Sequence, residues 1–97
     1  MNHEKNLPDY ITEGADGALT VELLRGITVD GAPCKSLTLR EPCVDDMLAA
    51  DKTAKSDTAM SEVILVANLA GVAPAAIRSA KMKDYARLQE ALGFMNG

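Results

Sequence analysis

The sequence contains very few aromatic side chains, a single histidine and only two cysteines. Tryptophan is absent, and one Phe and two Tyr make up the 3% of aromatic residues. A hydrophobic core must therefore be aliphatic, since hydrophobic residues still make up 47% of the 97-residue chain. Cys34 and Cys43 have no histidine near them in the sequence, and a zinc ion needs about four ligands. We therefore predict no metal site, no cofactor and two reduced thiols in a cytosolic protein.

Positive charge is also scarce. The chain has ten Lys and Arg residues and fourteen Asp and Glu residues, which give it a net charge of −4. The cations are scattered and form no run, so no basic stripe is available to neutralise phosphates. The apolar runs are shorter than the about 20 residues that a bilayer-spanning helix needs, and the polar N-terminus lacks the apolar region of a signal peptide. We therefore expect no nucleic-acid partner and no membrane contact.

Residue types that support catalysis do not come together in the sequence. Asp45 and Asp46 are adjacent, so on a helix they diverge by about 100° and cannot readily share one substrate atom. Their position in the first turn of a predicted helix fits the helix dipole instead. His3 is the only histidine that could activate a cysteine, and it lies in a polar N-terminal segment. We expect that the protein is not an enzyme.

The N-terminal half predicts an arm followed by a β-hairpin. Residues 1–17 are polar and aperiodic and are expected to form a flexible N-terminal arm. Residues 19–23 then alternate apolar and polar side chains, as a half-buried strand does. The pattern is interrupted at Gly26, where we expect a bulge or bend.

The hairpin turn is predicted at Asp30-Gly31, a strong sequence signature for a two-residue turn. Pro33 cannot donate a ladder hydrogen bond, so regular pairing is expected to begin after it, over residues 34–40. Because side chains alternate between the faces of a strand, Leu37 and Leu39 should pack on a helix.

The apolar stretch of residues 60–70 organises the second half of the chain. After Glu62 its only strongly polar side chain is Asn68. A helix that is apolar nearly all round must be covered on several sides or shared with a partner subunit. Asp57 can cap this helix, and Gly71 fits the position just past its end.

These patterns predict an α+β fold in which an N-terminal β-hairpin packs on a small bundle of three to four α-helices. A single domain is expected over residues 18–97, with the hairpin at 18–41. The helices are expected at about 44–54, 58–70, 74–79 and 82–95.

The last predicted helix carries a long apolar stripe for one small domain to cover, so we expect self-association. The candidate partner-binding residues lie on the central and last helices: Leu65, Leu69, Tyr85, Leu88, Leu92 and Met95.

Three short motifs follow one another in the sequence. Thr-Leu-Arg-Glu-Pro at 38–42 precedes a helix, Ala-Asn-Leu-Ala-Gly-Val at 67–72 closes the apolar helix, and Asp-Tyr-Ala-Arg-Leu-Gln at 84–89 opens the last one. Their order and spacing resemble the tail assembly chaperones of Mu-like and P2-like contractile-tailed phages, over about residues 19–94. The chain departs from the pattern at Cys43, where Thr or Ser would be expected before the helix.

The resemblance implies a chaperone that coats the tape measure protein, keeps it soluble and helps to recruit tail tube subunits. Such a chaperone leaves before the virion is complete and acts in the bacterial host cytoplasm. The implied partners are the tape measure protein, the tail tube protein, further copies of the chain, and a longer product of the same gene made by ribosomal frameshifting.

From the residues alone, two other kinds of interaction protein stay open. One is an antitoxin-like regulatory partner. The other is a DNA-binding regulator with a helix-turn-helix-like pair over 60–70 and 74–92, joined by a connection of suitable length. Its local basic support consists of four residues: Arg78, Lys81, Lys83 and Arg87.

Overall fold

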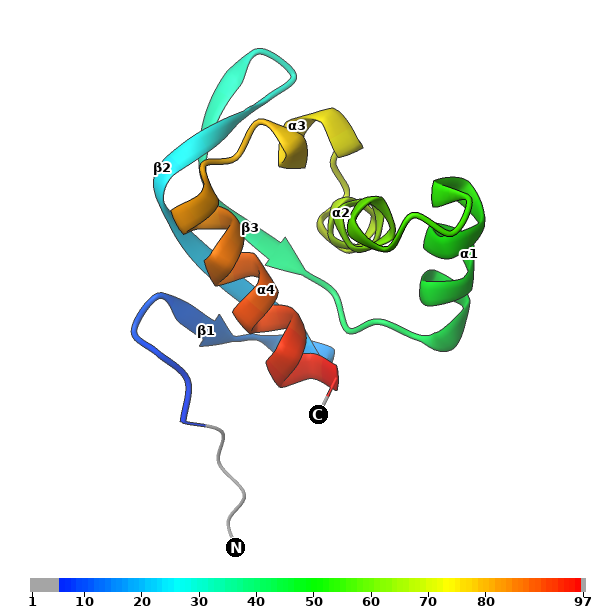
Figure 1. Ribbon diagram of the computed structural model, residues 1–97. Helices are drawn as coiled ribbons and strands as arrows, with labels where there is room; N and C mark the ends of the chain where they lie inside the picture. Colours follow the sequence, from blue (N-terminus) through cyan, green and yellow to red (C-terminus); the bar gives the residue numbers. More distant parts are fainter. Residues whose placement is uncertain (1–5, 97) are drawn as a thin grey trace, which may run out of the picture.

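The computed structural model describes residues 6–96 as a three-stranded sheet followed by four helices (Figure 1). The elements are, in order, β1 (Ile11–Glu13), a 3₁₀ turn η1 (Ala15–Gly17), β2 (Leu19–Val29), β3 (Ala32–Leu39), α1 (Val44–Ala54), α2 (Thr58–Ala70), α3 (Pro74–Arg78) and α4 (Met82–Asn96). The sheet is antiparallel with the order β1-β2-β3, and α4 lies across it against β2. The predicted α+β fold, a hairpin packed on a small helical bundle, is confirmed.

The hairpin turns at the predicted dipeptide. Val29 pairs with Ala32, and the two residues between them, Asp30 and Gly31, have φ of 52° and 81°. Positive φ at both positions defines the type I′ turn that matches strand twist. The strand β3 begins at Ala32, so the expectation that pairing starts only after Pro33 is wrong. Because β3 is an edge strand, its outward-facing positions tolerate a residue without N–H.

The third strand lies in the segment that the sequence predicts as an arm. Ile11 of β1 pairs with Val21 of β2 and is buried in the core. The expectation of a flexible arm over residues 1–17 is therefore corrected at β1, while residues 1–5 lie outside the described residues. A strand of three residues is too short to show a recognisable alternation in the sequence.

The bulge expected at Gly26 is present. Between Glu22 and Ile27 the strand β2 advances five residues while β3 advances only two, from Ser36 to Cys34. Gly26 has φ of 83°, and a Cβ placed on it would lie 2.8 Å from the backbone carbonyl oxygen of Cys34. A side chain at this position is therefore excluded both by the backbone conformation and by the neighbouring strand.

The bulge removes backbone N–H groups from the ladder, and a carboxylate from α4 receives them. Asp84 is fully buried and accepts hydrogen bonds from the N–H groups of Leu24, Arg25 and Gly26. Buried N–H groups need partners, so Asp84 satisfies donors that the bulge leaves unpaired. This contact fixes the start of α4 on the sheet.

The ends of α2 have the expected chemistry. The Asp57 carboxylate accepts a hydrogen bond from the Met60 N–H at 3.0 Å, as an N-cap does. Gly71 has φ of 72° and closes the helix in the left-handed conformation. Three residues later Pro74 opens α3, where its missing N–H has no helical partner to lose.

The core is aliphatic and lies between the sheet and the helices. Leu37 and Leu39 of β3 are buried in one cluster with Val66 and Leu69 of α2, as expected from their alternation. The helix α2 contacts α1, α3 and β3, so its nearly continuous apolar surface is covered on several sides. A second, smaller cluster joins α1 to α2 through Ala50, Ala54 and Ile64.

Candidate partner-binding surface

The structure divides the six candidate partner-binding residues into two groups. Leu69, Leu88 and Leu92 are buried in the core, where they support the fold and present almost no surface. Leu65, Tyr85 and Met95 are only half-buried, and they border the surface. A binding role for the six remains a prediction, and only the second group retains surface that a partner could touch without opening the core.

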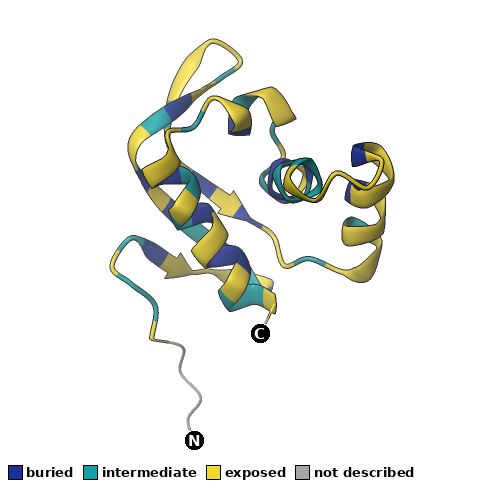
Figure 2. Ribbon diagram, viewed as in Figure 1, coloured by how far each residue is buried: buried dark blue, intermediate teal, exposed yellow. Residues whose placement is uncertain are grey.

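Three of the large exposed apolar side chains of the described residues lie on α1. This helix packs on α2 through the small residues Ala50 and Ala54, and its larger apolar side chains are exposed. In Figure 2 most of the α1 ribbon has the colour of exposed residues. Val44 is 68% exposed, Met47 53% and Leu48 55%. The helix is present over the expected range 44–54, but the sequence does not show that the two alanines form its packed face.

A hollow of about 320 Å³ lies beside this exposed face, which we call the α1 groove. It is lined by residues from the start of α1, the middle of α2 and the end of α4: Pro42, Cys43, Val44, Met47, Leu65 and Asn96. The predicted residue Leu65 therefore belongs to the α1 groove. Its neighbours Val44 and Met47 were not among the predicted binding residues.

The position of α1 is fixed by Arg40, the residue after β3. Its guanidinium forms two hydrogen bonds with the Asp46 carboxylate, at 2.7 and 2.8 Å, and its backbone N–H donates to the Leu69 carbonyl oxygen. Asp46 also accepts a hydrogen bond from the Cys43 N–H at 2.9 Å, so the helix start is stabilised although Cys43 replaces the usual Ser or Thr. The Arg40 and Cys43 hydrogen bonds hold the pKa of Asp46 well below its ordinary value.

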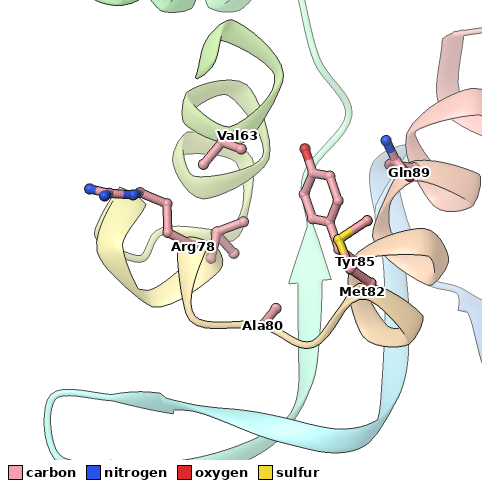
Figure 3. A pocket seen from close by; sticks show the side chains of 7 residues that line it. Val63, Arg78, Ala80, Met82, Tyr85 and Gln89 are labelled. Atoms are coloured by element: carbon pink, nitrogen blue, oxygen red, sulfur yellow. The ribbon is translucent and has the colours of Figure 1, made fainter. Parts of the chain in front are cut away.

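A second hollow, of about 340 Å³, lies on the other side of α2 and is called the α4 groove below (Figure 3). Val63 of α2 and Arg78 of α3 lie on one side of it, and side chains of α4 lie on the other. It is lined by Val63, Ile77, Arg78, Ala80, Met82, Tyr85 and Gln89. Met82, at the mouth, is the most exposed large apolar side chain of the described residues, at 76%.

Tyr85 joins the two walls of the α4 groove. Its hydroxyl donates a hydrogen bond to the Glu62 carboxylate at 2.7 Å, and the Gln89 side-chain N–H donates to the same oxygen at 2.8 Å. Partial burial and the adjacent Glu62 carboxylate raise the pKa of Tyr85, so the phenol stays protonated in the physiological range. Tyr85 is thus both a wall of the groove and a link between α2 and α4.

A family model described as "Phage tail assembly chaperone proteins, E, or 41 or 14" matches residues 20–97. The chain belongs to this family of phage tail assembly chaperones. The matched range includes all of β2 except its first residue, β3 and all four helices, and therefore every residue that lines the two grooves of the chaperone. No curated protein and no solved structure matches the chain.

The thiols of the chaperone are separate and free. Cys34 is half-buried in β3 and donates to the Ser36 carbonyl oxygen, whereas Cys43 is exposed at the start of α1. His3, the base considered for them, lies outside the described residues. Over residues 6–96, no three His, Cys, Asp or Glu side chains gather as a metal site would require, and no helix has the length and apolarity to cross a membrane.

Proposed function

We propose that this tail assembly chaperone binds apolar helical segments of the tape measure protein and keeps that protein soluble until the tail tube forms around it. The observation that carries the proposal is the exposed aliphatic surface beside two grooves, one on each side of α2. Exposed apolar patches on a small domain mark interaction sites. The tape measure protein enters the proposal through the family resemblance.

The side chains at the two grooves suit a partner of varied sequence. Met47 and Met82 are both exposed, and methionine is unbranched and adapts its shape to different apolar neighbours. Neither groove is lined by Trp or Phe, so contact would come from aliphatic side chains and one tyrosine. We therefore expect affinity to come mainly from burial of aliphatic surface, and no catalytic step is part of the proposal.

The further roles that we propose are recruitment of the tail tube protein and release before the virion is complete, both in the bacterial host cytoplasm. Additional copies of the chain and a longer frameshift product would share this fold and could extend the coat along the tape measure protein. These partners follow from the family resemblance.

The test is calorimetric titration of the full chain with overlapping fragments of the tape measure protein from the same tail gene cluster. Apolar fragments should bind with a negative change in heat capacity, measured at two temperatures, because apolar surface is buried. A polar fragment of the same protein is the control and should not bind. Absence of binding by every fragment, together with tight DNA binding that falls steeply with salt, would overturn the proposal in favour of a regulator.

A further inference from the structure

The floor of the α4 groove is apolar and accessible. Val63, Ile77 and Ala80 contribute aliphatic surface, and Tyr85 stands between the two walls (Figure 3). The volume of about 340 Å³ is within the range of pockets that hold apolar groups, about 300–1,000 Å³. Met82 lies at the open mouth, where it can cover an apolar side chain placed in the groove.

Positive charge lies beside the Met82 end of the groove. A neighbouring hollow that shares Met82 is lined by Arg25, Lys81 and Lys83. Arg78 lines the α4 groove on its α3 side, across from Met82 (Figure 3). No carboxylate of the described residues lines either hollow or forms an ion pair with these four cations. Because the whole chain carries a net charge of −4, this end of the groove reverses the overall sign of the molecule.

A carboxylate lies beside the opposite end of the groove, hydrogen-bonded to two of its lining residues. Glu62 receives the Tyr85 and Gln89 hydrogen bonds there, and Gln89 lies seven residues beyond Met82 along α4. At 1.5 Å of rise per helical residue, the two ends are about 10 Å apart. The groove therefore has a direction, with a carboxylate beside one end and a cluster of cations beside the other.

We propose that the α4 groove binds an apolar helical segment of the tape measure protein that carries acidic side chains on its C-terminal side, and that this side lies over Met82. The inference rests on the proposed function and names the chemistry and orientation of the bound segment. The negative C-terminal end of a helix dipole and the acidic side chains would both face Arg25, Lys81 and Lys83, while the positive N-terminal end would face Glu62. Complementary charge of this kind selects partners and fixes their orientation.

The experiment measures the affinity of tape measure fragments for the full-length wild type and for the double variant Lys81→Glu/Lys83→Glu. Both lysines are exposed, so the variant should fold as the wild type does, which circular dichroism checks. The matched control is Lys52→Glu/Lys55→Glu, which reverses two exposed lysines on and just after α1. We expect the first variant to bind at least about tenfold more weakly, and the control to stay within about twofold of the wild type.

The orientation is tested with the fragment. Moving the acidic residues from the C-terminal to the N-terminal side of the same apolar segment should weaken binding by about tenfold. Changing them to lysine should restore binding to the Lys81→Glu/Lys83→Glu variant. Met82→Ala should weaken binding several-fold through loss of apolar contact.

Three results would overturn the inference. If fragments bind the wild type and Lys81→Glu/Lys83→Glu equally well, the α4 groove is not their site, although the proposed function stands. If the two arrangements of acidic residues bind equally, the orientation is wrong. If the charge reversal abolishes DNA binding and leaves fragment binding unchanged, the cations serve a nucleic acid. Failure of every fragment to bind the wild type would remove the proposed function itself.

Discussion

The Asp84 carboxylate accepts a hydrogen bond from the Gly26 backbone N–H at 3.0 Å, which joins the first turn of α4 to the bulge of β2. The same carboxylate accepts from the N–H groups of Leu24 and Arg25. Asp84 is adjacent to Tyr85, a wall of the α4 groove. The contact that satisfies the bulge therefore also sets where one side of the proposed binding groove lies.

Replacing Asp84 should destabilise the fold strongly. Asp84→Asn retains one acceptor oxygen but places an N–H₂ group against buried N–H donors. We expect a loss of roughly 3 kcal/mol in the free energy of unfolding, since hydrogen bonds to charged groups contribute about 1.5–3 kcal/mol and buried unpaired groups carry a similar penalty. Urea unfolding measures the loss.

The control is Asp45→Asn, which replaces an exposed carboxylate in the first turn of α1. This variant should lose no more than about 1 kcal/mol in the free energy of unfolding. Equal losses in both variants would contradict the role given to Asp84.

The contribution of Asp84 should depend on pH. Burial raises the pKa of Asp84. The backbone hydrogen bonds from Leu24, Arg25 and Gly26 lower this pKa by more than burial raises it, and the positive charge of Arg87 adds to their effect. The pKa of Asp84 therefore lies below its ordinary value of 3.8. A carboxyl whose pKa is lower in the folded state stabilises the protein above its unfolded-state pKa and loses that effect as the pH falls through the folded-state value.

The stability gap between wild type and Asp84→Asn should therefore be constant near neutral pH and shrink below about pH 4. Chemical unfolding of both proteins at a series of pH values measures the gap. A gap that stays the same down to about pH 3 would show that the ionised form of Asp84 is not what stabilises the bulge.

Gly26 in the bulge and Gly71 at the end of α2 form a matched pair for substitution by alanine. Both have positive φ, of 83° and 72°, so each substitution should cost about 1–2 kcal/mol in backbone strain. A Cβ on Gly26 would also lie 2.8 Å from the Cys34 carbonyl oxygen, whereas a Cβ on Gly71 would meet nothing within 4 Å. We expect Gly26→Ala to lower the melting temperature clearly more than Gly71→Ala does. Equal melting temperatures would mean that the strands move apart at little cost.

Local chemistry explains which parts of the fold the sequence predicts. The Asp30-Gly31 turn and the Asp57 and Gly71 helix ends depend on the residues themselves and their immediate neighbours, and all are found as expected. The contact of Asp84 with Gly26 joins residues 58 positions apart, and no periodicity signals such a pair. In the sequence, Asp84 is simply a carboxylate in the first turn of a helix.

The candidate surface was only partly predictable for a related reason. A helical pattern shows that α1 has apolar positions, but both the small Ala50 and Ala54 and the larger Val44, Met47 and Leu48 are apolar. Packing distance to α2 decides between them, and this is a property of the folded molecule. The structure buries the alanines and leaves the larger side chains exposed.

Self-association should therefore depend on α1. The sequence predicts it from the α4 stripe, but Leu88 and Leu92 of that stripe are buried in the core of the same chain. Leu48 on the exposed face of α1 is more than half exposed, and a contact between two such faces would remove apolar surface from water. We expect light scattering at high micromolar concentration to give a mass above the 10.3 kDa monomer, and Leu48→Glu to return it towards the monomer.

The control variant is Ala49→Glu. It places the same charge one residue along the helix, about 100° away, and should associate as the wild type does. A strictly monomeric wild type would contradict the prediction, and equal effects of the two variants would mean that the contact is not made through this face.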